Sequence, residues 1–299
     1  MIKVVVTGCA GFIGSHVTEL LLLNDFKVIG IDNLSTGFAQ NIRIVEKSVG
    51  GKAENFKFFE VDICKPAQIT NLFEDVTYCF HLAALGSVPR SIKYPLNTNH
   101  ANVSGTLSVL NACITNKVKK IIFSSSSSVY GMSSPYAISK RCGEEYVRVF
   151  KKCYDLYYTI LRYFNVYGPR QSPNGDYAAV IPKWISKAKS GDPIEIYGDG
   201  AQTRHFTFVT DEARANLLAA IKETEGNHTI DIAHKDSASL LDIIEIIEER
   251  APFKEKLFKE HRKGDVKSSR ATVGYVESMI GFAAKVDLKT GIGIVMDML

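Results

Sequence analysis

The start of the chain places a glycine-rich turn directly after a short apolar run. Val4 to Val6 have the β-branched character of a buried strand, and Gly8, Gly11 and Gly14 follow before a helical pattern begins. Glycines at this spacing permit a tight turn, a close approach of the backbone to a pyrophosphate and close packing of the next helix. The sequence therefore predicts a strand, a turn and a helix whose N-terminus faces phosphate groups.

Short apolar runs and helical patterns continue to alternate through the first half of the chain. This rhythm is typical of a parallel sheet covered by helices, so we expect an α/β fold with a doubly wound, Rossmann-type sheet. The candidate strands are Lys3–Val6, Lys27–Ile31, Phe56–Glu60, Tyr78–Leu82, Lys120–Phe123 and Tyr158–Leu161, and the candidate helices are Phe12–Leu23, Asn99–Asn116 and Tyr136–Tyr154.

The rhythm changes after Gly168, where turn clusters separate shorter elements. We therefore expect residues 1–166 to form the nucleotide-binding domain and residues 167–299 to form mainly a smaller, C-terminal substrate-binding domain. A candidate strand at His228–Ile232 precedes a helix at Leu240–Arg250 and returns to the first domain. Residues 205–233 are accordingly expected to be interleaved with it.

Composition argues against several classes of protein. With 45% hydrophobic and 23% charged residues the chain should be globular, and its apolar runs are too short to cross a bilayer. Residues 1–3 lead directly into a strand, so we expect no membrane partner and a cytoplasmic location. The net charge of +4 is scattered and predicts no nucleic-acid partner. The six cysteines show no ligand spacing, so we expect reduced thiols and no metal site.

Carboxylates end two of the candidate strands in positions that suit a dinucleotide. Asp32 can accept hydrogen bonds from the adenosine ribose and repel a 2′-phosphate, which favours NAD over NADP. Alone, Asp32 would equally well be a turn former before Asn33, but the glycine turn favours the cofactor interpretation. Asp62 either accepts from the adenine amino group or caps a turn. Ala83 and Ala84 either let the dinucleotide lie close or only pack.

A tyrosine and a lysine lie four residues apart, on one face of a candidate helix. The Lys140 cation would favour the phenolate of Tyr136, which could then act as a base near neutral pH. The fifth candidate strand ends in serines, Ser124 to Ser128, where a parallel sheet presents its ligands. The pattern predicts a proton-transfer site in which a serine shares a hydrogen bond with the substrate and the tyrosine.

The chain resembles, over essentially its whole length, the extended short-chain dehydrogenases/reductases that act on nucleotide sugars. The likeness rests on the glycine turn, Asp32, the Ser126, Tyr136 and Lys140 set, and segments 83–91, 162–170 and 198–204. It implies NAD as the cofactor, with contacts at Gly8, Gly11, Phe12, Ile13, Gly14, Asp32, Asn33, Ser35, Gly37, Asp62, Ile63, Leu82, Ala83, Ala84, Tyr136, Lys140, Tyr163 and Val166.

The positions after the catalytic serine favour epimerisation over dehydration. Family members that dehydrate hexoses resemble one another in an Asp-Glu pair there, whereas this chain has Ser127 and Ser128, which cannot transfer protons at C5 and C6. The resemblance implies that Tyr136 takes the C4 hydroxyl proton while hydride passes to NAD⁺, giving a 4-keto sugar that is reduced on its other face. Ser126 would orient the oxygen, and Lys140 would hold the nicotinamide ribose.

Segments 86–91 and 177–184 resemble bacterial 4-epimerases that prefer UDP-N-acetylhexosamines, so UDP-GlcNAc and UDP-GalNAc are the expected substrates. Ser269 would leave room for the acetamido group, whereas Arg262 also fits an ordinary charged surface run. UDP-glucose and UDP-N-acetylglucosaminuronate stay open as substrates. A decarboxylase or dehydratase and a non-catalytic NAD sensor are less favoured. The implied sugar contacts are Gly86, Ser87, Ser126, Ser127, Ser128, Asn165, Ala179, Val180, Arg204, Arg262 and Ser269.

Two further expectations follow from the resemblance. The helices at Asn99–Asn116 and Tyr136–Tyr154 resemble those that pair as a four-helix bundle in family dimers, so we expect a homodimer. Between Tyr130 and Tyr136 the family usually carries a loop longer by about fifteen residues. Either this chain lacks the loop or a mobile loop is absent from the sequence as given, and we favour the second because residues 133–136 resemble its far side.

Overall fold

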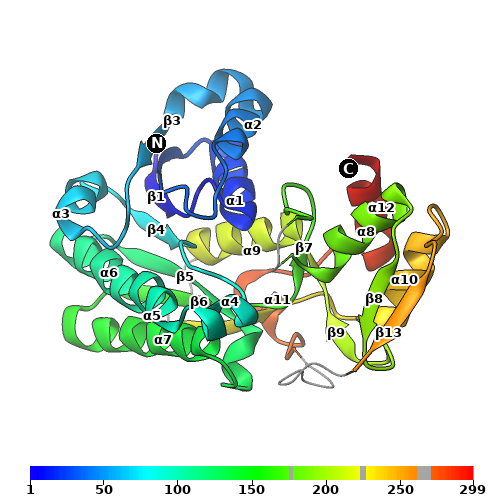
Figure 1. Cartoon of the computed structure of the whole chain (residues 1–299). Coiled ribbons are helices and arrows are strands. Elements are labelled where there is room, and N and C mark those ends of the chain that lie inside the picture. The colour runs from blue at the N-terminus through cyan, green and yellow to red at the C-terminus, as the bar shows by residue number, and fades with distance from the viewer. Residues whose placement is uncertain (175–177, 223–226, 261–270, 299) are drawn as a thin grey trace. The chain divides into compact units, whose positions relative to one another are not determined.

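The chain folds into two compact units (Figure 1). The computed structural model describes residues 1–174, 178–222, 227–260 and 271–298. The first unit comprises Met1–Arg162, Ala213–Ile230 and Ser278–Phe282, and the second comprises Tyr163–Glu212, Asp231–Glu277 and Ala283–Leu299. Residues 213–230, which return to the first unit, lie inside the span that the sequence suggested would be interleaved.

A seven-stranded sheet forms the centre of the first unit. Its order is β11-β6-β5-β4-β1-β2-β3, and the neighbouring pairs from β5 to β3 are parallel. The predicted α/β fold with a parallel sheet is confirmed. The strands are β1 (Lys3–Thr7), β2 (Lys27–Asp32), β3 (Phe56–Glu60), β4 (Tyr78–His81), β5 (Lys120–Ser126), β6 (Tyr157–Tyr163) and β11 (His228–Ile232).

Helices cover both faces of this sheet, with α1 and α9 on one side and α6 and α7 on the other (Figure 1). The longer helices are α1 (Phe12–Leu23), α2 (Ala39–Val49), α6 (Gly105–Thr115), α7 (Pro135–Tyr154) and α9 (Val209–Ile221). The shorter ones are α3 (Pro66–Ile69), α4 (Val88–Lys93), α5 (Pro95–Asn99) and the 3₁₀ turns η1 (Gly50–Asn55), η2 (Thr70–Phe73) and η4 (Ser127–Tyr130).

The helix expected at Asn99–Asn116 is corrected by the structure. A five-residue π turn, η3 (His100–Ser104), joins α5 to α6 in place of one regular helix. Inside this turn the Asn102 amide accepts from the backbone N–H of Leu85 at 2.7 Å and donates to the Leu85 carbonyl at 3.1 Å. A side chain bonded to backbone outside the helix explains why the helical periodicity breaks there.

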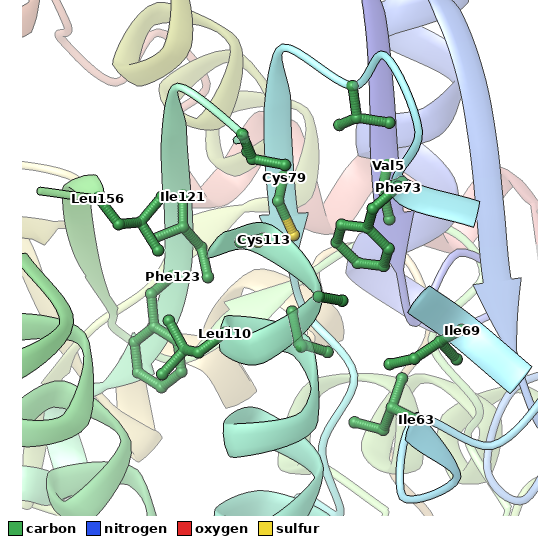
Figure 2. Packing of buried hydrophobic residues seen from close by; sticks show 14 of the residues in the cluster. Val5, Ile63, Ile69, Phe73, Cys79, Leu110, Cys113, Ile121, Phe123 and Leu156 are labelled. Carbon is green, nitrogen blue, oxygen red and sulfur yellow. The ribbon is translucent and has the colours of Figure 1, made fainter. Parts of the chain in front are cut away.

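The sheet face toward α6 and α7 is packed with apolar side chains (Figure 2). Alternate residues of the strands point to it, as the period of two in a strand requires. Gly143 lets α7 approach closely, because a Cβ there would lie 2.5 Å from the ring of Phe123. Buried members labelled in Figure 2 include Val5, Cys79, Leu110, Cys113, Ile121 and Phe123.

The second unit has its own apolar core, centred on Tyr167 and Trp184. Three two-stranded sheets contribute to it, pairing β10 with β7, β12 with β9 and β13 with β8. Its elements are β7 (Val166–Tyr167), α8 (Val180–Ser190), β8 (Ile194–Tyr197), β9 (Thr203–His205), β10 (Thr207–Phe208), β12 (Ser237–Ser239), α10 (Leu240–Glu248), β13 (Lys256–Lys259) and α12 (Leu288–Met298), with α11 (Val276–Ile280) running from this unit into the first.

Two residues explain where α10 begins. Ser239 and Asp242 form a capping box at its start. The Ser239 hydroxyl accepts from the Asp242 N–H at 3.1 Å, and the Asp242 carboxylate accepts from the Ser239 N–H at 2.7 Å, which satisfies two backbone donors.

Across the described ranges, no helix is both long and apolar enough to span a membrane.

We expect Leu110→Ala to lower the free energy of unfolding by about 2–5 kcal/mol, because it empties a fully buried position beneath the sheet. Urea unfolding followed by circular dichroism measures the change. Leu23→Ala, at the exposed end of α1, is the matched control and should change it by less than about 1 kcal/mol. Equal losses for the two variants would contradict the placement of the core.

Candidate active site

The turn between β1 and α1 brings three glycines against neighbouring backbone. Gly8 has φ +77°, and a Cβ there would lie 2.8 Å from the backbone nitrogen of Ala83. At Gly14 a Cβ would lie 2.0 Å from the carbonyl oxygen of Gly8. Gly11 immediately precedes α1 and donates its N–H to the same Gly8 oxygen at 3.0 Å. The turn therefore leaves no room for side chains where the sequence predicted close backbone approach to a phosphate.

Asp32, at the end of β2, is held by the glycine turn. Its carboxylate accepts from the backbone N–H groups of Ala10 at 3.0 Å and Leu34 at 2.8 Å. Burial raises the pKa of this carboxyl group, and these hydrogen bonds oppose the rise. Gly37 passes close by, because a Cβ there would lie 3.0 Å from the Asp32 carboxylate. The acid is thus fixed at the pocket wall.

A pocket of about 520 Å³ opens at the carboxyl ends of the first four strands, entirely within the first unit. This is where a doubly wound sheet binds its ligands. Ten residues expected to contact the cofactor line it: Gly8, Gly11, Asp32, Asn33, Ser35, Asp62, Ile63, Leu82, Ala83 and Ala84. Phe12, Ile13 and Gly14 form the first turn of α1 beside it.

One wall of the pocket was not foreseen from the sequence. Leu96, Asn97, His100 and Ala101, from α5 and η3, line it together with Cys64. None belongs to a recognisable motif, and the π turn that presents two of them gives no local sequence signal.

The serine end of β5 and the start of α7 bring the predicted catalytic residues together. The Ser126 hydroxyl lies near the Tyr136 phenol and lowers its pKa. Lys140, one turn further along α7, is buried and donates from Nζ to the carbonyl oxygen of Ser124 at 2.8 Å. Ser127 and Ser128 continue into η4, and Ser126 Oγ donates to Ser128 Oγ at 3.1 Å.

The electrostatics of this cluster suit proton transfer. Burial raises the pKa of Tyr136, and the hydrogen bond with Ser126 lowers it. Burial lowers the pKa of Lys140 to about 8, against the pull of the Glu144 carboxylate. Below about pH 8 Lys140 is therefore a cation, one helical turn along α7 from Tyr136.

Between Tyr130 and Tyr136 the structure has a short link, and the absence of a longer family loop from the sequence as given stays a prediction. The chain runs continuously from η4 through Gly131 to Ser134, whose side chain accepts from the Ala137 N–H at 3.2 Å and caps α7. This short link needs a positive φ of 44° at Met132. It keeps Tyr136 within hydrogen-bond reach of Ser126.

A hydrogen-bonded chain that sequence reasoning missed runs from the glycine turn to α7. Thr7 Oγ1 bonds to His81 Nδ1 at 2.7 Å, and His81 Nε2 bonds to Thr106 Oγ1 at 2.9 Å. Thr106 donates to the Asn102 carbonyl at 2.7 Å, and the Asn102 amide donates to Ser139 Oγ at 2.9 Å. Burial, with a smaller contribution from Lys140, lowers the pKa of His81 to about 3, so its ring is neutral.

Two predicted sugar contacts lie in the loop before α4. Gly86 is exposed, and a Cβ there would meet no atom within 4 Å. Ser87 has φ +90°, and its hydroxyl caps α4 by accepting from the Arg90 N–H at 3.3 Å.

The remaining predicted contacts belong to the second unit. Tyr163 ends β6, Val166 begins β7, and Ala179 immediately precedes α8, which starts at Val180. Arg204 lies in β9. Asn165 has φ +38° and donates its amide to the His205 carbonyl at 2.7 Å. Arg262 and Ser269 lie outside the described residues.

The six cysteines are free thiols, and none of the described residues form a group of three or more His, Cys, Asp or Glu that could hold a metal ion.

The glycine turn, Asp32 and the Ser-Tyr-Lys cluster all lie within a segment that matches a known protein family. Residues 4–233 match the model of the NAD dependent epimerase/dehydratase family. The chain belongs to this family. The predictions of an NAD-dependent nucleotide-sugar 4-epimerase, an isomerase, and of NAD as its cofactor are confirmed.

Relatives of this epimerase chain share its whole length. A putative UDP-glucose 4-epimerase of Methanocaldococcus jannaschii is 37% identical, over 97% of this chain and 95% of the relative. The structure of a UDP-N-acetylglucosamine 4-epimerase from Methanobrevibacter ruminantium is 38% identical, with a TM-score of 0.89, and 100% and 99% of the two chains are covered. That of a Bacillus cereus UDP-glucuronic acid 4-epimerase with UDP-glucuronic acid and NAD is 32% identical, with a TM-score of 0.88 over 99% and 98% of the chains.

We expect Gly14→Ala to weaken NAD binding by the epimerase at least tenfold, because its Cβ would collide with the Gly8 carbonyl and displace the turn. Isothermal titration calorimetry of cofactor-free protein measures the affinity. Gly51→Ala is the control, since a Cβ there meets no atom within 4 Å. Unchanged affinity in Gly14→Ala would contradict a dinucleotide site at this turn.

Proposed function

We propose that the chain interconverts UDP-N-acetylglucosamine and UDP-N-acetylgalactosamine by inverting the configuration at C4. The observation that carries the reaction type is the placement of Tyr136 near Ser126, one helical turn from the buried Lys140. Ser127 and Ser128, the residues that follow the catalytic serine, provide no carboxyl group for a dehydration.

The residues of the first unit suit the cofactor. The glycine turn gives backbone access to a pyrophosphate, Asp32 lies at the pocket wall for a ribose, and Asp62 lies across the same pocket for adenine. When bound, NAD⁺ supplies a reversible hydride acceptor for C4 of the sugar.

Tyr136 is the group that moves the C4 hydroxyl proton. Its phenol is partly buried and lies near the Ser126 hydroxyl, which favours the phenolate formed when the proton is taken from the sugar. Lys140 offsets the cost of forming the phenolate in a buried site. Because Lys140 is itself held by the Ser124 carbonyl, its charge stays one helical turn from the reacting oxygen.

Preference for an N-acetylated sugar rests on segments 86–91 and 177–184 and on likeness to a solved UDP-N-acetylglucosamine 4-epimerase over the full chain. Relatives named for UDP-glucose and UDP-glucuronic acid match nearly as much of the chain. We assign Asn165 and Arg204 to the diphosphate and sugar, since amide and guanidinium donors suit phosphate oxygens.

The proposal is tested by incubating the purified protein separately with UDP-GlcNAc, UDP-glucose, UDP-glucuronic acid and UDP-N-acetylglucosaminuronic acid, with and without added NAD. Anion-exchange chromatography and proton NMR identify the C4 epimers. We expect kcat/KM to be highest for UDP-GlcNAc. A higher value for an unacetylated sugar would reassign the substrate but leave the reaction in place.

We expect Tyr136→Phe to lower kcat at least a thousandfold while NAD affinity stays within about twofold, because only the proton-transferring oxygen is lost. Tyr146→Phe, on the exposed face of the same helix, should keep the wild-type rate. Near-normal turnover by Tyr136→Phe would exclude the phenol as the base.

We further propose that the protein is a homodimer joined through α4, α5 and α7. These helices carry exposed apolar side chains on neighbouring surfaces, namely Ile92, Leu96, Ile138, Tyr146 and Val149. Exposed apolar side chains on helices that pack together are typical of a protein–protein interface.

A cytoplasmic location stays a prediction from the sequence.

Light scattering after size-exclusion chromatography should give twice the chain mass for the wild type. Val149→Glu should shift the protein towards monomer, because it places a charge in the apolar interface. Ile221→Glu, at a similarly exposed position at the end of α9, is the control and should stay dimeric. A monomeric wild type at micromolar concentration would overturn the proposal.

A further inference from the structure

Glu144 is a fully buried carboxylate beside the catalytic pair. It lies on α7 one turn beyond Lys140, which lies one turn beyond Tyr136, so the three occupy one face of the helix. A buried acid is costly unless its oxygens are fully bonded. The hydrogen-bond partners of the Glu144 carboxylate therefore show which elements it connects.

The Glu144 carboxylate joins three elements. Ser125 Oγ, from β5, donates to Oε1 at 2.6 Å. Arg162, from β6, donates from Nε to Oε1 at 2.8 Å and from Nη2 to Oε2 at 2.7 Å. Arg148, one turn along α7, donates to Oε2 at 3.0 Å. Since Ser125 directly precedes Ser126, this acid ties the reactive end of β5 to the tyrosine–lysine helix.

The charged surroundings of the network are well defined. Arg141 also approaches Glu144, at 3.7 Å, and the Arg162 guanidinium stacks on the ring of Tyr130 at 4.7 Å. Hydrogen bonds and the charge of Arg162 keep the pKa of Glu144 below its usual value despite burial, so it is an anion. The groups facing Lys140 are His81 from β4, the Phe123 ring and Ser124 carbonyl from β5, and Tyr136 and Glu144 from α7.

Among these neighbours Glu144 is the one whose negative charge favours the cation of Lys140, and the Ser124 carbonyl and Phe123 ring support it as uncharged groups. His81 is neutral, and burial pushes the pKa of the lysine down to about 8. Loss of the carboxylate charge would let that pKa fall further, so that a larger share of Lys140 would be neutral near pH 7.

We propose that Glu144 is a positioning residue for proton transfer, which fixes the serine end of β5 against α7 and acts as the countercharge that keeps Lys140 a cation. The inference rests on the proposed roles of Tyr136 and Lys140. A purely structural acid at this place would affect stability but not the ionisation of Lys140.

The direct test compares Glu144→Gln with Glu145→Gln. Gln keeps the shape of Glu144 and removes its charge, while Glu145 is the adjacent, half-exposed acid that pairs with Arg141 and Arg148. In protein carrying ¹³Cε-labelled lysine, an NMR titration follows Lys140, whose signal is assigned from its loss in Lys140→Met. We expect the Lys140 pKa to fall by about one unit or more in Glu144→Gln and to stay put in Glu145→Gln.

Kinetics provide the second readout. In Glu144→Gln the alkaline limb of the kcat/KM profile should move to lower pH by the same amount as the NMR titration, because loss of the Lys140 cation sets that limb. Glu144→Asp keeps the charge and should restore the Lys140 pKa. A Lys140 pKa that is the same in Glu144→Gln and wild type would overturn the proposal.

Further variants separate a loss of folding, or a failure of the proposed function, from a failure of the role proposed for Glu144. If Glu144→Gln unfolds because Arg162 is left buried without its anion, the double variant Glu144→Gln/Arg162→Gln removes both charges and carries the same NMR test. If the wild type turns over none of the UDP-sugars, the proposed function fails, while the titration of Lys140 still decides the role of Glu144.

Discussion

The packing of α7 against β5 is the contact on which the rest of the site depends. Gly143 allows the helix to lie against Phe123, where any side chain would push it away. Lys140 then reaches the Ser124 carbonyl and Glu144 reaches the Ser125 hydroxyl, so two buried polar groups lock the register of helix and strand. Within that register Ser126 and Tyr136 meet. The position of the proposed proton-transfer pair thus depends on the packing of α7 against β5 more than on the link between these elements.

Burial gives this contact its chemical consequence. Lys140, His81 and Glu144 are all buried near the carboxyl ends of the central strands. Because little water reaches them, each charge acts strongly on its neighbours. The neutral His81 relays hydrogen bonds from the glycine turn, whereas Lys140 and Glu144 retain opposite charges. The cofactor turn and the proton-transfer helix are therefore parts of one connected polar layer inside the first unit.

Local pattern predicted much of this architecture. The limits of α1, β3 and β11 agree with the sequence because apolar periodicity and the glycine turn define them within a few residues. The grouping of Ser126, Tyr136 and Lys140 could be predicted because strand end and helix spacing are local signals, while their catalytic roles stay a prediction. Asn102 and Glu144 were missed since their partners lie far away in the chain, at Leu85 and Arg162. The expected length of the link before α7 came from resemblance and stays a prediction, while in the structure four residues with one positive φ join η4 to α7.

The measurement that tests the account most directly follows the hydrogen on C4 of the sugar. The enzyme is supplied with UDP-N-acetylglucosamine carrying deuterium at C4, and the epimerised product is analysed by NMR and mass spectrometry. If Tyr136 removes only the hydroxyl proton while the carbon-bound hydrogen leaves and returns as hydride, deuterium stays at C4 of the product without dilution. Loss of the label to water, or uptake of deuterium at C4 from D₂O by unlabelled substrate, would contradict the account.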